Sequence, residues 1–160
     1  RRFEMEWSMS TGSVRVEEKS YEMPPKEGLS IAHFITVTDI QRSCDYYEKV
    51  FGATVLSRGD AEGAPGYLRL ANIWMIINVG GGPTPDKPTV VLSVPDPNHI
   101  NSFMNFRVAD IQACYKEWKS RGAEFITEPI EKYGETRCYI RDPDGYIIEV
   151  GQSKDGVKYG

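Results

Sequence analysis

The sequence predicts an α+β protein made of two paired βαβββ modules. The main observation is an internal repeat: residues 37–41 read VTDIQ, and residues 108–112 read VADIQ, 71 positions later. A Gly-Ala pair recurs 70 positions apart, and residues 76–79 (IINV) correspond to residues 147–150 (IIEV). Three matches at nearly the same offset indicate duplication of one supersecondary unit. So small a unit needs a partner to bury its apolar surface, which is why two are expected to pair.

The first module is expected over residues 30–79. Residues 31–38 are rich in β-branched and aromatic side chains and predict a strand. Asp39 then suits a helix N-cap, apolar residues follow at helical spacing, and Gly52 suits the end of that helix. Three further strands are expected at residues 54–58, 67–70 and 73–79.

The second module is expected over residues 101–150, after a linker at residues 80–100 that is rich in glycine and proline. Within the linker, residues 89–94 are a candidate short strand. The second module closes with a β-hairpin, because an Asp-Pro-Asp-Gly turn at residues 142–145 lies between strand-like flanks.

Outside the modules, two end segments are expected. Residues 1–28 are an N-terminal arm, partly disordered or not native to the protein, and residues 154–160 are a C-terminal tail. Residues 29–153 then make one domain.

Composition restricts the function classes. The 160 residues carry a formal net charge of −4, which argues against nucleic acid or an anionic membrane as partner. No apolar run approaches the ~20 residues of a membrane span. Cys44, Cys114 and Cys138 are irregularly spaced and form no Cys-x-x-Cys pair. They are interpreted as buried thiols in a reducing compartment, so a cytoplasmic protein is expected.

Glu149, in the last predicted strand, is the residue that most needs an explanation. In that strand Ile147 and Glu149 share one face, while Tyr146, Ile148 and Val150 share the other. A carboxylate among inward-facing apolar residues points to a functional role. The alternative is a glutamate on an edge strand that faces water.

The repeat, with its V-x-D helix openings and its D-P-D-G-x-x-x-E ending, resembles the vicinal oxygen chelate superfamily over residues 30–152. This group contains glyoxalases, bleomycin-resistance proteins and extradiol dioxygenases. The resemblance implies two modules whose sheets curve around a cleft, where the family's enzymes hold a divalent metal. Carried over to this chain, the four metal positions fall on Ala32, Asn78, Phe103 and Glu149. The first and third carry no ligand atom and Asn78 is a weak neutral donor, so no metal cofactor is expected.

An alternative metal site would use the two histidines. Glu149 with His33 and His99 would resemble the two-histidine, one-carboxylate sets that bind one divalent Fe, Ni, Zn or Mn. His33 would need a β-bulge to turn toward the cleft, because regular alternation places it on the opposite face.

Without a metal, the cleft has the character of a small-molecule site, apolar with a few polar groups. Trp74 and Phe103 would stack on a planar ligand, and the polar side chains would orient it. The alternative is that these residues only fill a concave core and that Arg107 only forms a salt bridge. The candidate ligand-binding residues are Phe34, Trp74, Asn78, Phe103, Asn105, Arg107 and Glu149.

Three functions follow from these predictions. The first is a protein, expected to be a homodimer, that binds a small organic molecule without a metal. The second is a metal-dependent lyase, isomerase or dioxygenase that uses Glu149 with His33 or His99. The third is a metal-free enzyme in which Glu149 is the catalytic general base. The sequence does not specify the ligand.

Overall fold

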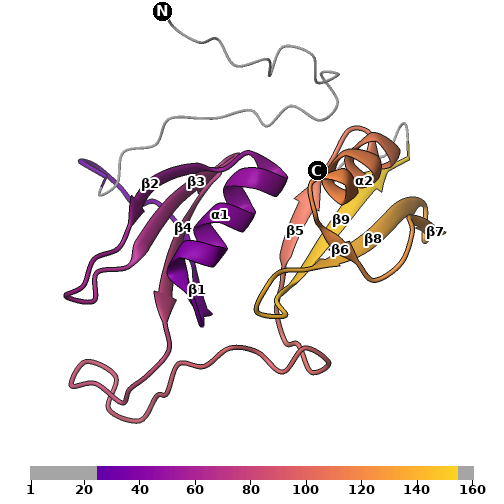
Figure 1. Ribbon diagram of the computed structural model, residues 1–160. Coiled ribbons are helices and arrows are strands. Elements are labelled where there is room, and N and C mark those ends of the chain that lie inside the picture. Colours follow the sequence, from indigo (N-terminus) through magenta and orange to yellow (C-terminus); the bar gives the residue numbers. More distant parts are fainter. Residues whose placement is uncertain (1–24, 155–160) are drawn as a thin grey trace, which may run out of the picture. The chain divides into compact units, whose positions relative to one another are not determined.

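The computed structural model describes residues 25–154, which form two compact units (Figure 1). The first unit contains residues 25–100 and 142–146, and the second contains residues 101–141 and 147–154. Each unit has one helix and one mixed sheet, so the predicted α+β fold class is confirmed. The predicted arm and tail lie outside the described residues, apart from residues 25–28 and residue 154. Within residues 25–154, neither helix is long and apolar enough to cross a membrane.

The first unit follows the predicted order of strand, helix and three strands. Its sheet has the strand order β1-β4-β3-β2, in which β1 is parallel to β4 and the other neighbours are antiparallel. The strand bounds lie within one residue of those predicted. The elements are β1 (Ala32–Val37), α1 (Ile40–Phe51), β2 (Thr54–Arg58), β3 (Gly66–Leu70) and β4 (Ile73–Val79).

Local signals fix both ends of α1, as predicted. The Asp39 side chain accepts a hydrogen bond from the backbone N–H of Arg42 at 3.0 Å, which satisfies a donor of the first helical turn. Gly52 ends the helix with a φ of 74°, a left-handed conformation that glycine adopts without a steric cost.

The core of the first unit lies between α1 and one face of its sheet (Figure 1). From the helix, Cys44 and Tyr47 are fully buried, and from the central strand β4, Met75 and Ile77 are fully buried as well. Because side chains alternate along a strand, the residues between them in β4 lie on the opposite, helix-free face.

The linker contains no strand at residues 89–94, so that prediction was wrong. Leu92 instead forms a single antiparallel bridge with Gly81, through two backbone hydrogen bonds of 2.9 Å. Prolines at positions 88, 95 and 97 surround this segment, and a proline cannot donate to a strand ladder. The linker therefore folds back on itself through isolated bridges, the second between Thr84 and Lys87, without extending a sheet.

The second unit has the same topology as the first, with one additional strand. Its sheet has the order β5-β9-β8-β6, and β7 pairs with β8. The first and last strands, β5 and β9, are parallel neighbours, as β1 and β4 are in the first unit. The elements are β5 (Met104–Arg107), α2 (Ile111–Ser120), β6 (Glu124–Phe125), β7 (Ile130–Lys132), β8 (Glu135–Arg141) and β9 (Ile147–Ser153).

The core of the second unit joins α2 to its sheet. Trp118 of α2 packs edge-to-face on Phe106 of β5, with ring centroids 6.1 Å apart. Cys114 and Cys138 are buried in the same core, and burial raises their pKa values to about 11 and about 12. Cys44 of the first unit is also buried, and none of the three cysteines, all within the described residues, forms a disulfide, so the prediction of buried thiols is confirmed.

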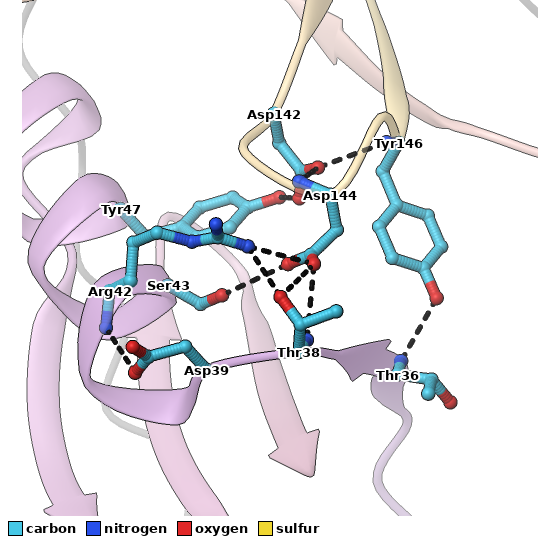
Figure 2. Close-up of polar contacts among 9 residues, drawn as sticks. All are labelled: Thr36, Thr38, Asp39, Arg42, Ser43, Tyr47, Asp142, Asp144 and Tyr146. Atoms are coloured by element: carbon cyan, nitrogen blue, oxygen red, sulfur yellow. Dashed lines mark hydrogen bonds and ion pairs between the residues drawn. The ribbon is translucent and has the colours of Figure 1, made fainter. Parts of the chain in front are cut away.

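The Asp-Pro-Asp-Gly turn joins β8 to β9 but belongs to the first unit (Figure 2). The Asp144 side chain is only 1% exposed, and its carboxylate oxygen Oδ1 accepts three hydrogen bonds. They come from the backbone N–H of Thr38 (3.1 Å), the hydroxyl of Thr38 (2.8 Å) and the guanidinium of Arg42 (2.9 Å). The turn thereby fastens to the segment where β1 leads into α1.

The other aspartate of the turn is buried beneath it (Figure 2). Asp142 Oδ2 accepts a hydrogen bond from the Tyr47 hydroxyl at 2.9 Å, and Oδ1 accepts the backbone N–H groups of Asp144 and Tyr146, both at 2.9 Å. Burial raises the pKa of Asp142 to about 6, although these hydrogen bonds act in the opposite direction. The Tyr146 hydroxyl accepts the backbone N–H of Thr36 at 2.9 Å.

Candidate functional site

Glu149 lies in the middle of the second sheet, on its helix-free face. Strand β9 has β5 on one side and β8 on the other, so Glu149 is not on an edge strand. Its neighbours Ile148 and Val150 are fully buried in the core beneath α2, and alternation places Glu149 on the opposite face. Even there, Glu149 is only 6% exposed. The alternative of a solvent-facing edge glutamate was wrong.

Both carboxylate oxygens of Glu149 accept hydrogen bonds from neighbouring strands. The Asn105 amide nitrogen donates to Oε1 at 3.1 Å, and the Tyr139 hydroxyl donates to Oε2 at 2.8 Å. These residues are the register partners of Glu149 on β5 and β8, so the three side chains form a row across the sheet. Burial, together with the bond to Glu149, raises the pKa of Tyr139.

Arg107 brings positive charge next to this row. Its Nη1 lies 3.9 Å from Oε1 of Glu149, and its Nη2 donates to Glu135 Oε2 and Ser153 Oγ, both at 2.8 Å. Glu135 also pairs with Arg137 at 2.6 Å. The hydrogen bond from Arg107 is the main cause that holds the pKa of Glu135 below its usual value. Arg107 therefore does form a salt bridge, with Glu135, as the simpler interpretation expected.

Gly151 makes this position of Arg107 possible. A Cβ atom at residue 151 would lie 2.1 Å from Arg107 Nη1 and 2.9 Å from its Cζ, so any larger residue would displace the guanidinium. Arg107 and Gly151 are register partners on β5 and β9. The absence of a side chain at position 151 therefore lets the guanidinium lie over the strand next to Glu149.

An exposed aromatic ring borders the polar row. Phe103 is 46% exposed and packs edge-to-face on Tyr139, with ring centroids 6.0 Å apart and an angle of 83°. The second unit thus combines four of the predicted site residues with Tyr139, whose facing the sequence did not settle. Counting outward from the turn at residues 142–145 would pair position 139 with position 148, whereas the observed loop also includes Tyr146, so that position 139 pairs with position 149.

The other three predicted ligand-binding residues lie on the helix-free face of the first sheet. Phe34 is 42% exposed, whereas Trp74 is 9% exposed and its indole N–H has no hydrogen-bond partner among the described residues. Asn78 accepts the backbone N–H of Val79 at 2.9 Å. These residues are brought to one face by the pairing of β1 with β4.

A surface depression of about 440 Å³ lies elsewhere on the first unit, where α1 begins. It is lined in part by Asp39, Gln41 and Arg58 and contains no predicted site residue. Arg58 is already paired with Asp45 at 2.8 Å. Its chemistry is that of a solvated surface, so we assign it no function.

A family model described as the Glyoxalase/Bleomycin resistance protein/Dioxygenase superfamily matches residues 30–150. The chain belongs to this superfamily. The match spans both units and confirms the resemblance drawn from the repeat and the D-P-D-G-x-x-x-E ending.

Solved structures of the superfamily and related proteins share the fold. A glyoxalase/bleomycin resistance protein/dioxygenase from Nocardioides is 17% identical with a TM-score of 0.66, covering 86% of this chain and 92% of that one. FosX, a genomically encoded fosfomycin resistance protein from Listeria monocytogenes, is 15% identical with a TM-score of 0.60, covering 81% and 95%. An integron cassette protein from the mobile metagenome of V. cholerae is 23% identical with a TM-score of 0.59, covering 80% and 98%. At these identities the likeness shows the fold alone.

The strand register corrects one of the positions that the superfamily resemblance had placed. In the first unit Phe34 pairs with Ile76, and in the second unit its repeat equivalent Asn105 pairs with Glu149. The residue equivalent to Glu149 is therefore Ile76, and the assignment to Asn78 was wrong by two positions. Burial agrees, because Ile148 and Val150, next to Glu149, correspond to the fully buried Met75 and Ile77.

The residues at the superfamily's metal positions do not fit a metal ion. With the corrected register they are Ala32, Ile76, Phe103 and Glu149, of which only the last has a ligand atom. Both oxygens of that carboxylate are already engaged by protein donors. Within residues 25–154, no group of three or more His, Cys, Asp or Glu side chains is arranged to hold a metal.

Neither histidine lies where the alternative metal site with Glu149 requires it. Strand β1 pairs with β4 in continuous register from Ala32 to Val37, so β1 has no bulge at His33. His33 therefore lies on the face opposite to Phe34, and burial lowers its pKa. The His99 side chain is 82% exposed and contacts Asp96, with 2.9 Å between Nδ1 and Oδ2.

Proposed function

We propose that this protein binds a small organic molecule on the helix-free face of its second sheet, without the superfamily's metal ion. The observation that carries the proposal is the Glu149 carboxylate, which is 6% exposed and is held by hydrogen bonds from Asn105 and Tyr139. A buried, charged side chain in a fixed orientation is a usual feature of sites that orient a ligand. The exposed ring of Phe103 supplies the apolar surface beside it.

The comparisons support a small molecule as the ligand class. The family description includes bleomycin resistance proteins, and FosX of Listeria monocytogenes is a fosfomycin resistance protein. Both names refer to small antibiotics, and binding a compound needs a site without necessarily any chemistry. For this chain we propose the same class of ligand, a small organic molecule, without naming the compound.

Metal content and ligand binding test the proposal together. Elemental analysis of the purified protein should find less than 0.1 equivalent of Fe, Ni, Zn or Mn, a limit we set at roughly one tenth of a formed site. Titration of isotope-labelled protein with a library of aromatic fragments should shift the amide NMR signals of Asn105, Tyr139 and Glu149. Replacement Glu149→Gln should change those shifts, whereas Glu124→Gln, at an exposed position of β6, should not. One bound metal per chain, or no fragment that affects these signals, would overturn the proposal.

A second candidate function is a metal-free enzyme in which Glu149 is the general base. The specific observation in its favour is the direct hydrogen bond of 2.8 Å between the Tyr139 hydroxyl and Glu149, since a phenol and a carboxylate in contact can pass a proton. The Glu149→Gln variant distinguishes the two proposed functions. A binding protein keeps measurable affinity and has no turnover to lose, whereas an enzyme loses turnover while it still binds substrate.

We also propose a homodimer located in the cytoplasm. A βαβββ unit leaves one sheet face without a helix, and Phe34 is exposed on that face of the first unit. Sedimentation analysis of the purified chain measures the oligomeric state directly, and a monomer at micromolar concentration would contradict the prediction.

A further inference from the structure

The Glu149 carboxylate determines which way its neighbours point their hydrogen-bonding groups. An ionised carboxylate can only accept hydrogen bonds, so the two groups that contact it must donate. Asn105 therefore turns its NH₂ group to Oε1, and Tyr139 turns its O–H to Oε2. The amide orientation of Asn105, which is otherwise ambiguous, is fixed by this contact.

These neighbours consequently leave two acceptors for a ligand, together with the second N–H of the Asn105 amide. With its nitrogen directed to Glu149, Asn105 presents its Oδ1, which has no hydrogen-bond partner among the described residues, and Asn105 is exposed. Tyr139 has committed its proton, so only oxygen lone pairs are left.

Part of the donor capacity nearby is already used by protein acceptors. Arg107 Nη2 donates to Glu135 and Ser153, and Arg137 donates to Glu135 through Nε at 2.9 Å. The two arginines and the two glutamates of this cluster balance in charge. The side that carries the exposed Phe103 ring therefore offers acceptors next to an aromatic surface.

We propose that the ligand is an aromatic molecule with a hydrogen-bond donor, a hydroxyl or an amine, directed at Asn105 Oδ1 and Tyr139 Oη. Its ring packs on Phe103. This inference rests on the proposed function, because it names the ligand class of the same site. A ligand without the donor leaves these acceptors desolvated and unpaired, so it should bind more weakly than a ligand that has the donor.

Two matched pairs of probes test the inference with isotope-labelled full-length protein. Benzyl alcohol is compared with benzyl methyl ether, and benzylamine is compared with benzyltrimethylammonium, which keeps the positive charge but has no donor. The dissociation constants are measured from the amide signals of Asn105, Tyr139 and Glu149. We expect the donor-bearing member of at least one pair to bind about tenfold more tightly than its capped partner. The pair that discriminates identifies the donor as a hydroxyl or an amine.

Glu149→Gln provides the decisive variant. A glutamine amide accepts through one atom and donates through the other, so Asn105 or Tyr139 must turn and present a donor in place of an acceptor. The tenfold preference for the donor-bearing probe should then fall to about twofold or less, because the variant offers the ligand one acceptor fewer. Glu124→Gln should keep the preference. Tyr139→Phe, which removes one acceptor outright, is the second variant if the glutamine substitution fails to fold.

The outcomes distinguish the inference from the proposed function. If the probes shift the signals but capped and uncapped members bind equally, the donor requirement is wrong and small-molecule binding stands. The same conclusion follows if Glu149→Gln and Tyr139→Phe both keep the full preference. If no probe of either kind, and no fragment of the wider library, shifts signals in residues 103–107, 137–141 or 147–151, the inference and the proposed function fail together.

Discussion

Replacement of Asp144 by alanine should destabilise the first unit more than any surface substitution. The carboxylate is only 1% exposed, and its Oδ1 accepts the backbone N–H and hydroxyl of Thr38 and a guanidinium N–H of Arg42. Its Oδ2 also lies 3.4 Å from the Ser43 hydroxyl (Figure 2). Alanine removes every one of these acceptors at once.

The expected magnitude follows from how much water can replace the lost partners. A hydrogen bond to a charged group contributes about 1.5–3 kcal/mol, and the backbone N–H and hydroxyl of Thr38 both lose such a bond. The Arg42 side chain is 46% exposed, so water recovers most of its share and the ion pair adds at most about 1 kcal/mol. Thr38 is exposed as well, so the lower end of these ranges applies, and we expect the free energy of unfolding to fall by about 3 kcal/mol, which corresponds to a decrease of about 6–12 °C in Tm.

Urea unfolding of the full chain, followed by circular dichroism, measures this loss. Asp144→Asn keeps an acceptor for Thr38 but removes the charge, so its loss should be about half as large. Asp86→Ala is the control, because that side chain is 82% exposed and its replacement should change stability by no more than about 0.5 kcal/mol. An Asp144→Ala midpoint equal to that of Asp86→Ala, at an unchanged m-value, would refute the assigned role of this contact.

Three further predictions concern the second unit and the turn. Gly151→Ala should be close to neutral in the wild type, because displacing the partly exposed Arg107 costs up to about 1 kcal/mol and offsets the gain of glycine to alanine in a strand. The same change should stabilise an Arg107→Ala background by about 0.5–1 kcal/mol, and urea unfolding that gives an equal effect in both backgrounds would contradict this. Asp142 has a folded-state pKa of about 6, raised by burial from 3.8, so its contribution to stability is largest below about pH 4 and is lost, by about 3 kcal/mol in all, as pH rises through 6. The difference in unfolding free energy between wild type and Asp142→Asn should therefore change in that direction by about 2 kcal/mol over pH 4–6, and a constant difference would disprove it. Incubation with EDTA should leave the thermal unfolding midpoint unchanged, and a decrease of several degrees would show a structural metal at or near Glu149.

Sequence patterns alone determined the local features of this protein. Asp39 begins the first helix and Gly52 ends it because capping chemistry depends only on residues within one turn. Alternation along β9 placed Glu149 opposite the core because a strand has a fixed period of two. The duplicated V-x-D pattern gave the two units and the superfamily, since it marks the same strand-to-helix transition twice.

Only the tertiary structure decided how the strands and the turn are aligned. Two residues join β3 to β4, whereas five residues join β8 to β9, so the offset of 71 does not carry through to the last strand. Glu149 lies opposite Asn105, and Ile76 is its equivalent in the first unit. The repeated letters IINV and IIEV could not reveal the shift, because an offset of two keeps every side chain on the same face. The contact of Asp144 with Thr38 spans 106 positions of sequence. Such a contact depends on where folding brings the turn, and neither residue carries a local signal for the other.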